Sequence, residues 1–164
     1  MQANLINPFL LSIHNVMETM LSIKPEQSIP FAKTDSLTSG DISGVIGFIK
    51  EDFSGAVALS FPKITALRVF NLLTGEHSSR LGADVQDAIG EMANMVAGGA
   101  KSELSKHGIS FHLTIPTVVV GRNHIMNHLD RHPVIVVPMS ISGDKFTMEI
   151  VMKVDSGKIS GGNV

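Results

Sequence analysis

A carboxylate and a carboxamide that lie close together on one predicted helix are the first candidates for chemistry in this chain. Glu91 and Asn94 are three residues apart, and positions three apart are neighbours on a helix surface. At about 100° per residue, Asp87 and Gly98 fall on the same face, all four positions within about 60° of one another. This face therefore presents two carboxylates, an amide and a glycine along one line.

The amide of Asn94 suggests what such a face could do. A carboxamide is no base at neutral pH, but it both donates and accepts hydrogen bonds, so it can hold and orient a water molecule. Phosphoryl transfer needs mainly positioning and charge neutralisation. Glu91 could pair with a lysine of a partner protein and fix the register between the two molecules. No cluster of metal-binding carboxylates accompanies the pair, so a Mg²⁺ ion would have to arrive with the substrate.

A solvated polar face is the alternative interpretation of the same residues. The residue types weigh against this alternative. Asparagine is a mediocre helix former, and each helical glycine costs about 0.8–1 kcal/mol of helix stability relative to alanine. Gly98 lies on the face of Asn94, where the missing side chain would let another backbone come close. Gly90 and Gly99 could equally reflect tight packing onto a sheet. From these residues alone, a functional face and a solvated face both stay open.

The helix that positions this face is predicted to run from about Ala83 to Lys106, and Gly108 ends it. Its buried side is an apolar stripe at helical spacing, made of Val85, Ile89, Met92, Val96 and Ala100. Met95 lies nearer to the face of Glu91 than to this stripe.

Two further helices and a hairpin are predicted before this helix. The first helix should begin with Asn7 as its N-cap and Pro8 in its first turn and end near Leu21. Residues 28–37 predict a weak or edge strand, because Pro30 interrupts them. Residues 44–49 and 56–61 predict a β-hairpin. Pro62 should open a second helix, which ends at Gly75.

The segments after the central helix repeat this order. Residues 111–121 predict a strand that contains Pro116, and residues 134–142 and 145–154 predict two strands joined through residues 143–144. We therefore expect an α+β fold built from pseudo-duplicated helix-plus-three-strand modules, with a largely antiparallel sheet and the long helices on one side. Residues 1–155 should form a single domain, and residues 156–164 a flexible tail.

Composition narrows the classes of function. The 164 residues have a net charge of −2, which gives no basic footprint and disfavours nucleic acid as a partner. There is no cysteine, which excludes disulfides and thiol chemistry. No signal peptide pattern and no apolar run of transmembrane length occur, so we expect a soluble, cytoplasmic protein without a membrane partner.

The motif on the central helix resembles that of the CheC/CheX/FliY family of chemotaxis phosphatases. The family pattern is an acidic residue or serine, then E-x-x-N, with a proline further on in a strand. The matching residues are Asp87, Glu91 and Asn94, then Gly98, then Pro116 within Thr-Ile-Pro-Thr-Val-Val at 114–119. The doubled helix-plus-strand layout also matches the family fold, so the resemblance extends over most of the chain.

Within this family the chain resembles the CheX branch. Members of the CheC type can carry the motif on both long helices, but here Glu18 is followed three residues later by Leu21. The first helix therefore has no second copy of the motif. A single motif on the second long helix, in a chain without a flagellar-switch C-terminal domain, is typical of CheX.

The resemblance implies a phosphatase that hydrolyses the aspartyl phosphate of a CheY-like response regulator. Asn94 would orient the attacking water, and Glu91 would pair with a lysine of the regulator. Further contacts with the regulator are expected from Asp87, Met95, Gly98 and Lys101. The chain itself would bind no metal or cofactor, because Mg²⁺ would stay on the regulator. A homodimer formed through sheet pairing is also implied.

Two alternatives remain at this point. The first is a non-catalytic adaptor of the same fold, similar to the flagellar-switch middle domain, that binds a response regulator or flagellar switch component without hydrolysing the phosphate. Such an adaptor has no need of the Asn94 amide.

The second alternative is a metal site at His124, His128 and His132, which have helical i, i+4, i+8 spacing with Asp130 nearby. Gly121 and Pro133 bracket this segment, which favours solvated loop histidines.

Overall fold

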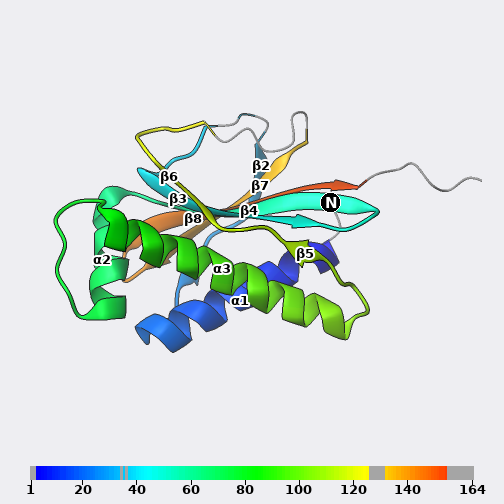
Figure 1. The fold of residues 1–164 in the computed structure, drawn as a ribbon, viewed down its shortest axis with the longest axis horizontal. Helices are drawn as coiled ribbons and strands as arrows, with labels where there is room; N and C mark the ends of the chain where they lie inside the picture. The colour runs from blue at the N-terminus through cyan, green and yellow to red at the C-terminus, as the bar shows by residue number, and fades with distance from the viewer. Residues whose placement is uncertain (1–2, 34, 36, 126–131, 155–164) are drawn as a thin grey trace, which may run out of the picture.

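The computed structural model describes residues 3–33, 35, 37–125 and 132–154 (Figure 1). Its elements, in chain order, are α1 (Ala3–Leu21), β1 (Glu26–Gln27), β2 (Phe31–Lys33), β3 (Ile42–Ile49), β4 (Phe53–Phe61), α2 (Lys63–Thr74), α3 (Ala83–Lys106), β5 (His112–Leu113), β6 (Thr117–Val120), β7 (Val134–Ile141) and β8 (Asp144–Val154). The tail expected at residues 156–164 lies outside the described residues. None of the helices in the described ranges has the length and hydropathy needed to cross a lipid bilayer.

The described strands form one eight-stranded sheet in which every pairing is antiparallel. Its order is β1-β7-β8-β4-β3-β5, with β2 also paired to β7 and β6 also paired to β3. The short strands β1 and β2 therefore share one edge, beside β7, and β5 and β6 share the other, beside β3. The predicted α+β class with a largely antiparallel sheet is confirmed.

The strand order has an internal two-fold relation. If β1/β2 are exchanged with β5/β6, β3 with β7, and β4 with β8, the sheet has the same strand order read from its opposite edge. The helices that precede the two sets of strands, α1 and α3, lie on the same face of the sheet (Figure 1). This topology confirms the predicted pseudo-duplication and places the long helices side by side.

A proline interrupts each edge of the sheet. Pro30 lies between β1 and β2, and Pro116 lies between β5 and β6. Proline has no N–H for the hydrogen-bond ladder, so it is confined to edges and breaks. The weak edge strand predicted around Pro30 is confirmed, whereas the single strand predicted over residues 111–121 is wrong, because Pro116 divides it into two.

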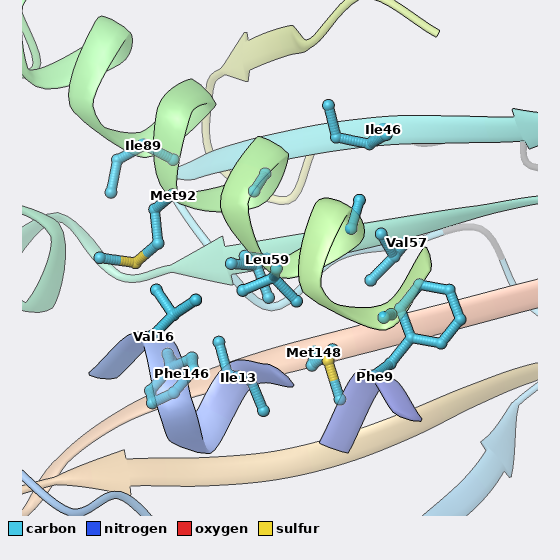
Figure 2. Close-up of a cluster of buried hydrophobic side chains, with 14 of the residues drawn as sticks. Phe9, Ile13, Val16, Ile46, Val57, Leu59, Ile89, Met92, Phe146 and Met148 are labelled. Carbon is cyan, nitrogen blue, oxygen red and sulfur yellow. The ribbon is translucent and has the colours of Figure 1, made fainter. Parts of the chain in front are cut away.

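The core fills the space between the sheet and the pair α1 and α3 (Figure 2). Side chains from both helices and from β3, β4 and β8 meet there: Phe9, Ile13, Val16, Ile46, Val57, Leu59, Ile89, Met92, Phe146 and Met148. At one point helix and sheet come especially close. A Cβ atom added to Gly44 would lie 2.7 Å from the carbonyl oxygen of Ile89, so this glycine lets the backbone of α3 rest on β3.

The first helix differs from its prediction at its beginning. It starts at Ala3 rather than at Asn7, and Pro8 lies inside it. A proline within a helix removes one backbone hydrogen bond. Leu5 and Ile6, which precede it, pack against the core, and this apolar burial offsets the missing hydrogen bond.

The second helix has the boundaries that its sequence predicted. Pro62 precedes its first residue, and Gly75 ends it with a left-handed φ of 74°. Because Pro62 has no side-chain acceptor for a cap, the cap comes from a distant residue. The carboxylate of Asp41 accepts a hydrogen bond of 2.7 Å from the backbone N–H of Lys63, the first residue of α2.

Candidate active site on helix α3

Helix α3 carries the candidate site, and its boundaries are those predicted. It runs from Ala83 to Lys106, with Asp84 in its first turn and Lys106 in its last. Charges of these signs at these ends stabilise a helix through its macrodipole. All five residues of the predicted apolar stripe are buried: Val85, Ile89, Met92, Val96 and Ala100. The rotation of the helix about its axis is therefore fixed by the core.

This rotation places the candidate residues on the side of α3 away from the sheet. Asp87 and Glu91 are exposed, and Asn94 and Gly98 are half-buried. Within the described residues, the side chains of Asp87, Glu91 and Asn94 form no hydrogen bond or ion pair. A carboxylate and an amide without internal partners remain free to bind groups of another molecule.

The three glycines of α3 have three different surroundings. A Cβ atom added to Gly90 would lie 3.0 Å from Cγ2 of Val118 in β6, and one added to Gly99 would lie 2.2 Å from the hydroxyl of Ser12 in α1. A Cβ atom added to Gly98 would meet no atom within 4 Å. Gly90 and Gly99 therefore serve packing, whereas Gly98 leaves space on the face that carries Asn94.

On one side, the candidate face is bordered by the segment between β5 and β6. The Cβ atom of Pro116 lies 3.9 Å from the Cβ position of Gly90, and Figure 1 shows this segment passing alongside α3. Thr114 fixes it to the sheet, because its N–H donates to the carbonyl of Gly47 and its hydroxyl accepts from the N–H of Gly47, both at 2.9 Å. Ile115, between Thr114 and Pro116, is 85% exposed.

On the other side, the face is bordered by a groove between α1 and α3. Its volume is about 320 Å³, and its lining residues are Pro8, Leu11, Ser12, Asn15, Val16, Thr19, Met95, Gly99 and Glu103. Met95, predicted to contact a partner, is half-buried in this groove. Lys101, also predicted to contact a partner, follows Gly98 by three positions and is half-buried.

Two apolar residues beside the site were not identified from the sequence. Leu11 is 49% exposed on α1, and Ile115 is 85% exposed. A β-branched residue within a β-branched stretch predicts a strand, so Ile115 was assigned to one, whereas it lies between β5 and β6. The one available signal was its position next to Pro116.

His124 is the first of the three histidines considered as a metal site, and its ring is hydrogen-bonded within the protein. The ring Nδ1 of His124 lies 2.8 Å from the carbonyl oxygen of Gly121, and its Nε2 lies 2.8 Å from the hydroxyl of Ser43. Since a carbonyl only accepts, Nδ1 donates and Nε2 of the neutral ring accepts from Ser43. The bond from Nε2 thus ties His124 to β3, and the bond from Nδ1 closes a turn with Gly121. His128 lies outside the described residues, and no group that could hold a metal ion occurs among those described.

Comparison with known proteins adds to this geometry. The family model for the chemotaxis phosphatase CheX matches residues 42–140. A curated relative, the CheY-P phosphatase CheX of Thermotoga maritima, is 31% identical over 124 residues, which cover 75% of this chain and 79% of that protein.

Solved structures show the same fold. A CheC-like superfamily protein from Shewanella sp. PV-4 has a TM-score of 0.87 and 35% identity, over 93% of this chain and 99% of that one. A complex of CheX with CheY, BeF₃ and Mg²⁺ from Borrelia burgdorferi includes a chain with a TM-score of 0.79 and 23% identity, over 93% of this chain and 99% of that one. At that identity the second likeness shows the fold alone.

Proposed function

This chain belongs to the CheX family of chemotaxis phosphatases, and we propose that it hydrolyses the aspartyl phosphate of a CheY-like response regulator through Glu91 and Asn94. The observation that carries the proposal is the face of α3 on which these two side chains lie together, without partners among the described residues. The relative from Thermotoga maritima is a CheY-P phosphatase, which supports this class of substrate.

In the proposed mechanism, the amide of Asn94 enters the active site of the regulator and holds a water molecule in line with the acyl phosphate. The oxygen of the water attacks phosphorus, and the bond from phosphorus to the aspartyl oxygen breaks. Inorganic phosphate and the free aspartate carboxylate are the products. Asn94 supplies no base, because a loose phosphoryl-transfer transition state depends on positioning and charge neutralisation.

Charge neutralisation would come from the regulator. Within the described residues this chain offers no cluster of metal ligands, and the related complex contains Mg²⁺ together with CheY. We propose that Mg²⁺ arrives bound to the regulator. Glu91 then pairs with a lysine of the regulator, and this ion pair fixes the position of Asn94 against the phosphate.

The rigidity of α3 suits this role. Its backbone rests on β3 at Gly44, and its buried stripe is locked into the core (Figure 2). A group that orients a reactant must be held within a fraction of an ångström of the productive position. The helix therefore offers Asn94 in a fixed position, and little ordering is needed when the regulator binds.

The test is the decay of a phosphorylated response regulator with and without this protein. We expect the wild type to accelerate decay, and Glu91→Ala to raise KM and lower the maximal rate, because the register is lost with the ion pair. Glu51→Ala, which removes an exposed carboxylate from the turn between β3 and β4, should behave like the wild type.

The adaptor alternative predicts another result in the same assay. An adaptor would bind the phosphorylated regulator, as measured by calorimetry, and leave its decay at the spontaneous rate. That outcome would reject the phosphatase proposal. A Glu91→Ala variant with unchanged KM and rate would reject only the role of Glu91.

A further inference from the structure

The candidate face of α3 is narrower than a stable protein interface. Specific interfaces bury about 800 Å² on each partner and involve about 20–30 residues. Asp87, Glu91, Asn94 and Gly98 make one line along a single helix. A regulator that places its phosphate at Asn94 must therefore also cover the elements on both sides of α3.

The first of these elements presents an apolar side chain at a fixed position. Ile115 is 85% exposed, and the two hydrogen bonds between Thr114 and Gly47 hold its backbone to the edge of the sheet. The neighbouring Pro116 touches α3 at Gly90, one helical turn before Asn94. Such a rigid apolar anchor loses little entropy when a partner covers it.

The second element is the groove between α1 and α3. Leu11, 49% exposed, lines it from α1, and Met95 lines it from α3. Among the described residues that line it, Glu103 alone is charged, and it accepts a hydrogen bond of 2.7 Å from Lys106. This hydrogen bond holds the pKa of the Glu103 carboxyl below its usual range. Because Lys106 already pairs with this carboxylate, the groove suits apolar and uncharged polar side chains.

We infer that the response regulator docks astride α3, with Ile115 as its anchor on one side and Leu11 in the α1–α3 groove as its anchor on the other. This inference rests on the proposed function. The two apolar contacts flank Asn94 and exclude bulk water from it, as the apolar surroundings of an interface centre do. A second copy of this chain on the same surface would cover Glu91 and Asn94, so the occupant is the regulator.

The experiment compares KM and maximal rate for the phosphorylated regulator in three matched variants. Ile115→Gln and Leu11→Gln should each raise KM about tenfold, the loss typical of an interface anchor, with the maximal rate unchanged. Ile64→Gln is the control, because Ile64 is 76% exposed on α2, outside both flanks. All three residues are exposed, so thermal unfolding should stay within a few degrees of the wild type.

The outcomes separate this inference from the proposed function. If the wild type accelerates decay but Ile115→Gln and Leu11→Gln keep the KM of Ile64→Gln, the docking mode is wrong while the phosphatase activity stands. A raised KM for only one of the two variants would also overturn docking astride α3. If the wild type itself fails to accelerate decay, the proposed function fails first.

Discussion

At the scale of single residues, Gly98 and Gly99 show how neighbouring positions of one helix can serve different purposes. Both cost helix stability relative to alanine. At Gly99 this cost allows α1 to pack closely, because the Ser12 hydroxyl occupies the space of a Cβ atom. At Gly98 no atom of the described structure uses the space. A use outside the chain, at the surface of the regulator, would explain why the glycine is tolerated there.

The two positions therefore form a matched pair of substitutions. Gly98→Ala should raise the free energy of unfolding by about 0.8 kcal/mol through helix propensity, and it should raise KM for the phosphorylated regulator severalfold. Gly99→Ala gains the same helix propensity, but its methyl group overpacks the contact with Ser12 at a cost of about 1–3 kcal/mol, so the free energy of unfolding should fall. Urea denaturation and initial rates measure both effects. A Gly98→Ala variant with unchanged KM would show that the regulator does not use this space.

At the scale of elements, the three-residue strand β2 is anchored by an ion pair that crosses the sheet. Lys33 Nζ lies 3.0 Å from a carboxylate oxygen of Glu149 in β8, and the two side chains are 12% and 3% exposed. Lys33 also donates to the carbonyl of Leu37. Burial raises the pKa of the Glu149 carboxyl, and the hydrogen bond and charge of Lys33 partly offset this rise.

This pair predicts a pH-dependent loss of stability in Lys33→Met. An acid whose pKa is raised on folding binds more protons in the folded state, so its contribution to stability falls as pH rises through that window. Removing Lys33 raises the folded pKa of Glu149 further. We expect Lys33→Met to lower the free energy of unfolding by about 3 kcal/mol at neutral pH. This loss should shrink as the pH falls toward the ordinary pKa range of a glutamate, because Glu149 then becomes neutral.

Urea denaturation of the wild type and Lys33→Met across this pH range measures the loss. Lys50→Met is the control, since Lys50 pairs at 3.3 Å with the exposed Asp52 and surface pairs contribute at most about 1 kcal/mol. A loss in Lys33→Met that is equally large at every pH would contradict the account, because it would not depend on the charge of Glu149.

Most elements could be predicted from local signals, and the exceptions have identifiable causes. The boundaries of α2 and α3 follow from Pro62, Gly75 and the apolar stripe, all of which act within a turn or two. The predicted start of α1 was wrong, because the packing of Leu5 and Ile6 onto the core outweighs the local preference of Pro8 for the first turn of a helix. Such packing depends on distant strands and leaves no local pattern.

At the scale of the whole molecule, the sequence predicted the line of Asp87, Glu91, Asn94 and Gly98 but neither of its flanks. Helical spacing alone puts these four residues on one face. The neighbours of that face depend on sheet order, which brings β6 beside β3 and sets α1 beside α3. The position of Ile115 and Leu11 beside the site could therefore be identified only from the folded structure. The homodimer implied by the family resemblance stays a prediction.

The same topology explains why one site per chain is expected in a pseudo-duplicated fold. The internal two-fold relation equates α1 with α3, yet α1 carries no E-x-x-N motif, because its one glutamate, Glu18, is followed three residues later by Leu21. Instead, α1 contributes Leu11 and Asn15 to the groove beside the site. We propose that one half of the molecule supplies the chemistry and the other half helps to bind the regulator.

The central claim is that the amide of Asn94 positions the attacking water, and it is tested most directly by the maximal dephosphorylation rate of Asn94→Ala. The rate is measured with saturating phosphorylated regulator, and the affinity for the same regulator is measured in parallel. We predict that the rate falls roughly 100-fold or more, the scale of loss when a positioning group is removed, while the affinity changes little. A variant that keeps the wild-type rate would contradict the account.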